Sequence, residues 1–341
     1  MTPAKVAGKV LPDACFMKDI FKPGIKNKKM TEHIKGLIAA HFTPMDKKGN
    51  LNPGIIPQYY QFLKHNGVAG AFICGSTGEG VSLSIAEKKA VAAAWADATG
   101  SDKHFKVILF VGGTCLSDCK ELALYAREKR LYAVSFTAPF YFRPGDTGSL
   151  ADCCGEVAAV VPDMPLYYYH IPSLTGVGFS MIDLLKNVDG KVPNFAGIKY
   201  THWDFMDFLS CLHFKHGKYD MLWGRDENIL AALALGAEAA VGSTYNYAAP
   251  LYHDLIKAFH RNDLQQARTL QQQSIDMISL LGKYGGMATG KAYMKLLDLD
   301  CGGFRLPVKD MDDEHFELFR KDTEKINFSR FCSHASRVAV E

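Results

Sequence analysis

From Gly36 onward, short apolar runs alternate along the chain with longer segments whose apolar residues recur at helical spacing. Parallel strands that are covered on both faces are typically continuous apolar runs, whereas an amphipathic helix repeats its apolar positions with a period of about 3.6 residues. The pattern therefore predicts a repeated strand–helix unit and a parallel sheet.

Eight short runs have the composition of strands: 37–41, 69–74, 106–111, 133–137, 166–169, 195–199, 221–223 and 239–241. The helical segments among and after them are 55–66, 84–99, 117–130, 149–160, 181–188, 203–216, 226–235 and 248–261. Eight such units in about 225 residues fit a (β/α)₈ barrel. A doubly wound open sheet is the main alternative, but no G-x-G-x-x-G follows the first strand. We therefore predict an α/β fold, a (β/α)₈ TIM barrel with a C-terminal helical appendage.

Three regions follow from this pattern: an irregular basic N-terminal arm at 1–33, the barrel at 34–262, and C-terminal helices with a loose tail at 263–341. The appended helices are predicted at 263–283, 287–298 and 313–328, with a break at Leu306-Pro307. Basic residues cluster at 18–29, which would suit a targeting or nucleic-acid-binding tail, but a solvated leader is the simpler interpretation.

Helix starts are also predicted from the sequence. Ser84 with Glu87, and Ser180 with Asp183, each resemble a capping box. Thr201 could begin a cap for the helix that follows it.

Composition gives no support for a nucleic-acid-binding, membrane-spanning, disulfide-rich or metal-binding protein. The formal charge of +3 over 341 residues is too small to argue for a nucleic-acid or membrane partner. No apolar run approaches the roughly 20 residues that a membrane helix needs. The nine cysteines form no recognisable disulfide framework, and Cys115 and Cys119 lack a second Cys/His pair at zinc spacing, so we expect no metal site. An odd cysteine count without a signal peptide favours a reducing compartment, and we expect the cytoplasm.

The strand predicted at 195–199 ends on a lysine. Alternation places Gly197, Lys199 and Thr201 on one face, and Ala196 and Ile198 on the other. Burial lowers the pKa of a lysine, and the neutral amine can attack a ketone to form a Schiff base. A strand-end lysine that simply reaches solvent is the alternative.

Barrel enzymes place their sites at the carboxyl ends of the strands, so residues after the other strands are candidates for the same site. The turn G-S-T-G-E-G at 75–80 offers backbone amides and the hydroxyls of Ser76 and Thr77 to a carboxylate or phosphate, or is an ordinary turn. Tyr169 would stand at the rim, where a phenol can relay protons, although aromatic packing is the alternative. His170 has the opposite strand parity and is not included.

Acidic and hydroxyl groups follow the seventh and eighth strands. Asp226 and Glu227 could cap a helix or accept hydrogen bonds from a polyol. The segment G-S-T-Y-N at 242–246 includes Ser243 and could form a second cradle of amides and hydroxyls.

Three of these motifs together, G-S-T-G-E at 75–79, Y-x-I-P at 169–172 and G-I-K-x-T at 197–201, resemble the dihydrodipicolinate synthase/N-acetylneuraminate lyase family of class I aldolases over roughly 35–306. The resemblance implies a homotetramer of barrels with C-terminal helices, and a pyruvate Schiff base on Lys199. It implies no cofactor and no metal, because the iminium acts as the electron sink.

Within the family, the segment at 169–176 has Leu174 where the synthase branch usually carries an arginine. The chain is instead similar to the lyase branch in K-x-T at 199–201, G-x-D-E at 224–227 and G-S-T-Y-N at 242–246. The similarity implies cleavage of N-acetylneuraminate to pyruvate and N-acetylmannosamine. The basic arm departs from the family, and His202 has no assigned role.

The resemblance also implies a role for each site residue. Tyr169 would remove the proton of the C4 hydroxyl, and Tyr141, through Thr77, would complete a proton relay from a neighbouring subunit. Ser76 and Thr77 would hold the pyruvyl carboxylate. The sugar hydroxyls would be bound by Thr201, the Gly224 backbone, Asp226, Glu227 and Ser243.

Two alternatives stay open at this point. The first is another pyruvate-dependent aldolase or synthase, of the dihydrodipicolinate synthase or 2-keto-3-deoxy sugar acid type. The second is a non-catalytic barrel that binds a sialic acid or pyruvate.

Overall fold

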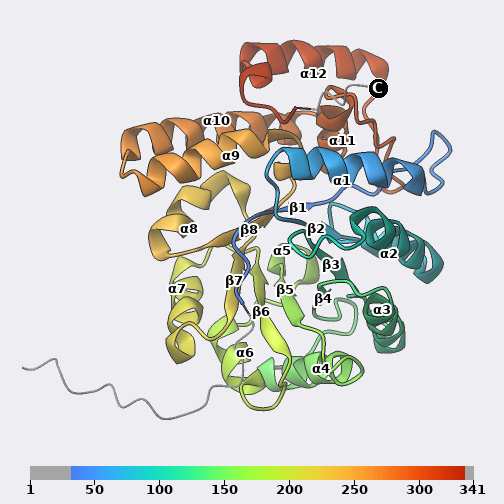
Figure 1. The fold of residues 1–341 in the computed structure, drawn as a ribbon, viewed down its shortest axis with the longest axis vertical. Helices are drawn as coiled ribbons and strands as arrows, with labels where there is room; N and C mark the ends of the chain where they lie inside the picture. Colours follow the sequence, from blue (N-terminus) through green and yellow to red (C-terminus); the bar gives the residue numbers. More distant parts are fainter. Residues whose placement is uncertain (1–31, 335–341) are drawn as a thin grey trace, which may run out of the picture. The chain divides into compact units, whose positions relative to one another are not determined.

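Eight parallel strands pair in sequence order and close into a barrel with β1 hydrogen-bonded to β8 (Figure 1). The computed structural model describes residues 32–334, so nearly all of the predicted N-terminal arm and the last residues of the predicted tail lie outside the described residues. The closed barrel confirms the α/β fold class and excludes the open sheet.

The strands are β1 Gly36–Ala40, β2 Gly70–Ile73, β3 Lys106–Phe110, β4 Ala133–Phe136, β5 Leu166–His170, β6 Phe195–Tyr200, β7 Asp220–Trp223 and β8 Ala239–Gly242. The surrounding helices are α1 Ile56–His65, α2 Ile85–Thr99, α3 Leu116–Glu128, α4 Thr147–Ala159, α5 Pro172–Thr175, α6 Met181–Val188, α7 Phe205–His213, α8 Ile229–Leu235 and α9 Tyr245–His260. Three further helices follow: α10 Leu264–Lys283, α11 Met287–Lys295 and α12 Asp313–Lys325. Every strand predicted from the apolar runs is present, whereas α5 was not predicted.

Side chains from alternate strand positions form two separate apolar clusters. Tyr167 and Tyr169 pack inside the barrel, and Tyr168 packs outside it against the helical layer. His170 also follows the outward parity, as the alternation predicted. Position along a strand therefore decides which side chains can reach the barrel mouth.

The C-terminal helices form a layer beside the barrel. α10 packs along α9, and α11 and α12 contact α10 in turn (Figure 1). A buried ion pair between Lys291 on α11 and Glu79 joins this layer to the turn after β2. The appendage is thus connected to one of the strand-end loops.

The Ser84 capping box is confirmed, because its hydroxyl accepts from the Glu87 amide and Glu87 accepts from the Ser84 amide. The box predicted at Ser180 is wrong. The Ser180 hydroxyl donates to Asp207 at 2.7 Å, and the Asp207 carboxylate accepts the amides of Met181 and Ile182 at the start of α6. The helix start is therefore capped by a residue of α7, which no local pattern reveals.

The predicted alternation in β6 is interrupted near its start. Pairing with β5 shifts between Leu166 and Tyr167, because Leu166 pairs with Phe195 and Tyr167 pairs with Gly197. The extra residue, Ala196, packs with the inner cluster, so its predicted outward position is wrong. Gly197 fits there because a Cβ would lie 1.8 Å from the carbonyl oxygen of Asp220.

Thr201 is not the cap of α7: that position belongs to Asp204, whose side chain accepts from the amides of Met206 and Asp207. The eight cysteines among residues 32–334 are all free thiols. In the same part of the chain, none of the helices combines the length and apolar composition of a membrane span.

Candidate active site

Lys199 lies inside the barrel near the carboxyl end of β6, with 3% of its surface exposed. Its Nζ is 4.0 Å from the ring centre of Phe72 and 4.0 Å from that of Tyr169. Burial lowers the pKa of Lys199 from 10.5 to about 7, although the nearby charge of Asp226 opposes the shift. A large fraction of this amine is therefore neutral near pH 7 and able to act as a nucleophile.

Tyr169 faces Lys199 from the adjacent strand, and the two residues are directly paired between β5 and β6. Its hydroxyl lies 3.5 Å from the hydroxyl oxygen of Ser76, and its backbone carbonyl accepts from Thr137 at 2.9 Å. Burial raises the pKa of Tyr169 above its ordinary value, with the hydroxyls of Ser76 and Thr201 partly offsetting this. The group is thus a neutral phenol at pH 7, suited to pass a proton rather than to persist as a phenolate.

The turn after β2 places Ser76 and Thr77 at the same end of the barrel, and both are half-buried. Its geometry is held by Thr43, whose hydroxyl donates to the Gly78 carbonyl at 2.6 Å, and by the left-handed backbone of Glu79. The Glu79 carboxylate accepts from Lys291 at 3.0 Å and from the Arg305 amide at 2.7 Å. Buried contacts on its far side therefore fix this turn.

Thr201 and Gly224 meet where β6 and β7 end. A Cβ on residue 224 would lie 2.0 Å from the Thr201 Oγ1 atom, so only glycine allows this approach. The Gly224 amide donates to the Tyr200 carbonyl at 2.8 Å. The two predicted sugar-binding positions thus form one continuous edge of the mouth.

Asp226 lies in a single turn of 3-10 helix, Asp226–Asn228, and is buried. One carboxylate oxygen accepts from the Thr244 amide at 3.0 Å and from its hydroxyl at 2.6 Å. Burial raises the pKa of Asp226, and these hydrogen bonds oppose the rise. The residue connects the loops after β7 and β8 and supplies the charge that acts on Lys199.

Glu227, which follows Asp226 in the sequence, is half-buried. Ser243, at the end of β8, is half-buried as well. The Glu227 carboxylate forms an ion pair with Arg225 at 2.5 Å. The Ser243 carbonyl accepts from the amide and the side chain of Asn246. Their predicted contacts with a sugar stay predictions.

Tyr141 is not brought to the other site residues by this chain alone. It lies in the β4–α4 loop with 78% of its surface exposed, and its ring packs on that of Phe142, at 5.1 Å between centres. Its role in a relay stays a prediction that requires a second subunit.

Sequence reasoning missed the residues that shape the pocket around the amine. Phe72 lies under Lys199, Phe110 packs edge-on against Tyr169 at 5.8 Å, and Thr244 binds Asp226. Phe72 and Phe110 belong to the inner cluster, so strand parity extended from Lys199 to its neighbours could have found them.

His170 is buried outside the barrel and its ring lies 5.5 Å from that of His202. Burial lowers the pKa of His170 to about 3, so it is neutral. His202 in turn packs on Trp203 at 4.9 Å. Neither histidine belongs to the inward-facing set.

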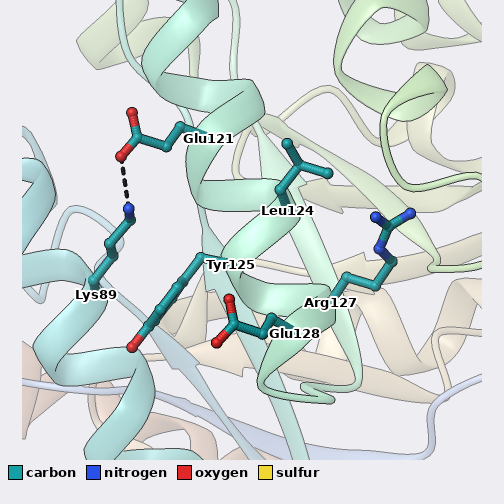
Figure 2. Close-up of a pocket in the computed structure, with 6 residues that line it drawn as sticks. All are labelled: Lys89, Glu121, Leu124, Tyr125, Arg127 and Glu128. Atoms are coloured by element: carbon teal, nitrogen blue, oxygen red, sulfur yellow. Dashed lines mark hydrogen bonds and ion pairs between the residues drawn. The ribbon is translucent and has the colours of Figure 1, made fainter.

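A separate recess lies on the outer surface between α2 and α3 (Figure 2). It is lined by Lys89 and Glu121, which form an ion pair, and by Leu124, Tyr125, Arg127 and Glu128. It contains no pair resembling Lys199 and Tyr169, so the barrel mouth is the candidate active site.

Similarity to known proteins assigns the chain to a family. The family model described as "Dihydrodipicolinate synthetase family" matches residues 33–326. The chain belongs to this family. Its site is therefore that of a family whose reaction class is the pyruvate-dependent class I aldolase.

Individual relatives are similar over most of their length. The N-acetylneuraminate lyase of Rattus norvegicus is 38% identical over 302 residues, which are 87% of this chain and 94% of that protein. The structure of Proteus mirabilis N-acetylneuraminate lyase has a TM-score of 0.84 at 37% identity, covering 87% of this chain and all of that one. The lyase from Aliivibrio salmonicida gives a TM-score of 0.84 at 35% identity, covering 87% and 98%.

Proposed function

We propose that this chain cleaves N-acetylneuraminate reversibly to pyruvate and N-acetylmannosamine through a Schiff base on Lys199. The observation that carries the proposal is the buried amine of Lys199, which lies against the ring of Tyr169 and of which a large fraction is neutral near pH 7. The lyases similar to this chain, and Leu174 in the segment where synthases usually carry an arginine, support the choice of substrate.

The first step is attack of the Lys199 Nζ lone pair on the C2 carbonyl of the open-chain sugar acid. The carbinolamine takes up a proton and loses water to give a protonated imine, and Ser76 and Thr77 hold the C1 carboxylate. Because the pKa of the amine is about 7, a large fraction of it is already deprotonated at neutral pH, and this step can proceed there.

Cleavage follows when the C4 hydroxyl loses its proton and the C3–C4 electron pair moves into the iminium. The raised pKa of Tyr169 favours a relay in which the phenol passes the proton by way of the substrate carboxylate. N-acetylmannosamine leaves, the enamine is protonated at C3, and water releases pyruvate and restores the amine.

The sugar hydroxyls are bound along the edge formed by Thr201, Gly224, Glu227 and Ser243, with Asp226 supporting that edge from beneath. In an oligomer, Tyr141 of a neighbouring subunit joins the relay. The assembly proposed for this arrangement is a homotetramer.

The test is borohydride reduction with pyruvate, followed by mass spectrometry of the labelled peptide, together with a cleavage assay. The wild-type chain should form one adduct on Lys199 and cleave N-acetylneuraminate. Lys199→Ala should abolish both while its circular dichroism stays that of the wild type. Substantial cleavage by Lys199→Ala would refute the covalent route, and an adduct without cleavage would favour another pyruvate-dependent aldolase.

A further inference from the structure

Arg225 lies at the end of β7, beside the residues proposed to bind the sugar. β7 ends at Trp223, and Arg225 follows it in an extended conformation, one residue before the 3-10 turn that contains the buried Asp226. The guanidinium reaches Glu227, with Nη2 at 2.5 Å from the carboxylate Oε1. Arg225 thus acts on the rim through its neighbour.

The Arg225 guanidinium also contacts the loop after β6. Its guanidinium carbon lies 5.5 Å from the ring centre of Trp203, a distance at which a cation is attracted to an indole face. Trp203 is 64% exposed and therefore gains little from burial at this position. Its contact with Arg225 joins the β6 and β7 loops across the edge where Thr201 meets Gly224.

An ion pair with arginine has two effects on a carboxylate at a binding site. It occupies one carboxylate oxygen with a charge-assisted hydrogen bond, and it restricts the side chain to one orientation. Here the bond from Arg225 occupies Oε1 of Glu227 and leaves Oε2 able to accept from a ligand hydroxyl.

We propose that Arg225 is a positioning residue that holds Glu227 toward the hydroxyl-bearing tail of the substrate, and that Trp203 holds Arg225 in place. The inference rests on the proposed function, because the contact of Glu227 with the sugar is part of it. It identifies Arg225 and Trp203 as determinants of specificity for a long polyhydroxy acid over pyruvate-derived substrates with a short chain.

The main experiment compares Arg225→Leu with wild type in the cleavage of N-acetylneuraminate. We expect KM to rise about tenfold while kcat stays within about twofold of wild type. Glu227 is not a reacting group, so misplacing it should cost less than the roughly hundredfold penalty of misplacing a reacting group. Half-saturation of borohydride trapping by pyruvate should not change, since pyruvate does not extend to this edge. Arg225→Lys should raise KM less than Arg225→Leu does, and Trp203→Ala should also raise KM.

A double-variant cycle separates positioning from a general structural role. Glu227→Gln and Arg225→Leu should each raise KM, and the double variant should be no worse than Glu227→Gln alone. Additive effects, or a fall in kcat without a change in KM, would overturn the inference. Arg127→Leu is the matched control, because Arg127 lies on the outer surface of α3 (Figure 2) and also pairs with a carboxylate, that of Asp163, at 3.8 Å.

The same variants distinguish failure of the inference from failure of the proposed function. If wild type cleaves N-acetylneuraminate and Arg225→Leu has an unchanged KM, the inference alone is wrong. If wild type traps pyruvate but does not cleave N-acetylneuraminate, the proposed function is wrong. The variants are then assayed by condensation of pyruvate with erythrose and with glyceraldehyde. The inference holds only if Arg225→Leu reduces condensation with erythrose, the longer aldehyde, more than condensation with glyceraldehyde.

Discussion

The side-chain nitrogen of Lys199 lies 4.0 Å from the ring centre of Tyr169, and the two residues are paired on adjacent strands of the barrel. Strand pairing fixes their separation, and inward parity places both side chains in the same enclosed volume. The same enclosure that lowers the pKa of the amine raises that of the phenol, so at pH 7 both groups can be uncharged. These two opposed pKa shifts underlie the expected effects of pH and of substitutions at this site.

Burial of Lys199 should reduce the stability of the protein. The folded state binds this proton less tightly than the unfolded state, so stability is lowest below pH 7 and rises as the pH goes from about 7 toward 10.5. We expect Lys199→Met to be more stable than wild type. The gain should be largest at pH 6 and should shrink by about 1.4 kcal/mol per pH unit above pH 7.

The measurement is urea unfolding of both proteins at pH 6 and pH 9, at one protein concentration. Lys191→Met, on the exposed end of the loop before β6, serves as the control and should show no such dependence on pH. A gain in stability that is equal at the two pH values would contradict a buried amine with a lowered pKa.

Tyr169→Phe should affect the step in which the carbon–carbon bond breaks. Removal of a positioned proton relay typically lowers a rate by about 10²–10⁴-fold. We expect kcat to fall within this range while KM changes little, and borohydride trapping of pyruvate to continue. Steady-state kinetics and trapping on the same preparation check this. Were KM alone to change, the hydroxyl would be binding substrate and not transferring a proton.

Asp226→Asn should move the pH dependence of Schiff-base formation. The charge of Asp226 raises the pKa of Lys199 against the effect of burial, so its removal should lower that pKa further below 7. The acidic limb of the trapping rate should therefore shift to lower pH. Glu227→Gln is the control, since Glu227 is paired with Arg225 and should leave this limb in place. An unchanged limb in Asp226→Asn would mean that the carboxyl group is already neutral in the folded protein.

The barrel could be predicted from the sequence because buried parallel strands are nearly continuous apolar runs, and each strand was located to within about a residue. Strand parity likewise placed Lys199 and Tyr169 inward and His170 outward. What could not be predicted depends on partners distant in the sequence. The position of Ala196 is set by a shift in pairing with β5, and the cap of α6 comes from Asp207.

In the candidate site, too, local features were predictable from the sequence and contacts between distant segments were not. The turn with Ser76 and the lysine at the end of β6 are local patterns and were found. The aromatic lining from Phe72, the bond from Thr244 to Asp226 and the ion pair of Glu79 with Lys291 join separate strands or layers. Such contacts require the register of the whole barrel, which periodicity does not supply.

The buried ion pair between Glu79 and Lys291 should couple the C-terminal helices to the pyruvate-binding turn. Both side chains are almost fully buried, and burial lowers the pKa of Lys291 although Glu79 opposes the shift. Lys291→Met leaves a buried carboxylate without its cation and should cost about 3–5 kcal/mol. Adding Glu79→Gln should restore most of that loss, because no charge then remains buried. Arg320→Met, which breaks surface pairs with Glu317 and Glu324, should cost about 0–1 kcal/mol per pair.

The same variants report on the site, because the Glu79 amide donates to the Ser76 carbonyl at 3.1 Å within the turn. If the ion pair fixes that turn, Lys291→Met should require more pyruvate for half-maximal borohydride trapping, under conditions where the variant is fully folded. Arg320→Met should trap pyruvate like wild type. A Lys291→Met protein that is destabilised but has unchanged half-saturation would show that the pair stabilises the fold without positioning Ser76. A requirement for more pyruvate that persists in the double variant would show that the turn needs the charges themselves.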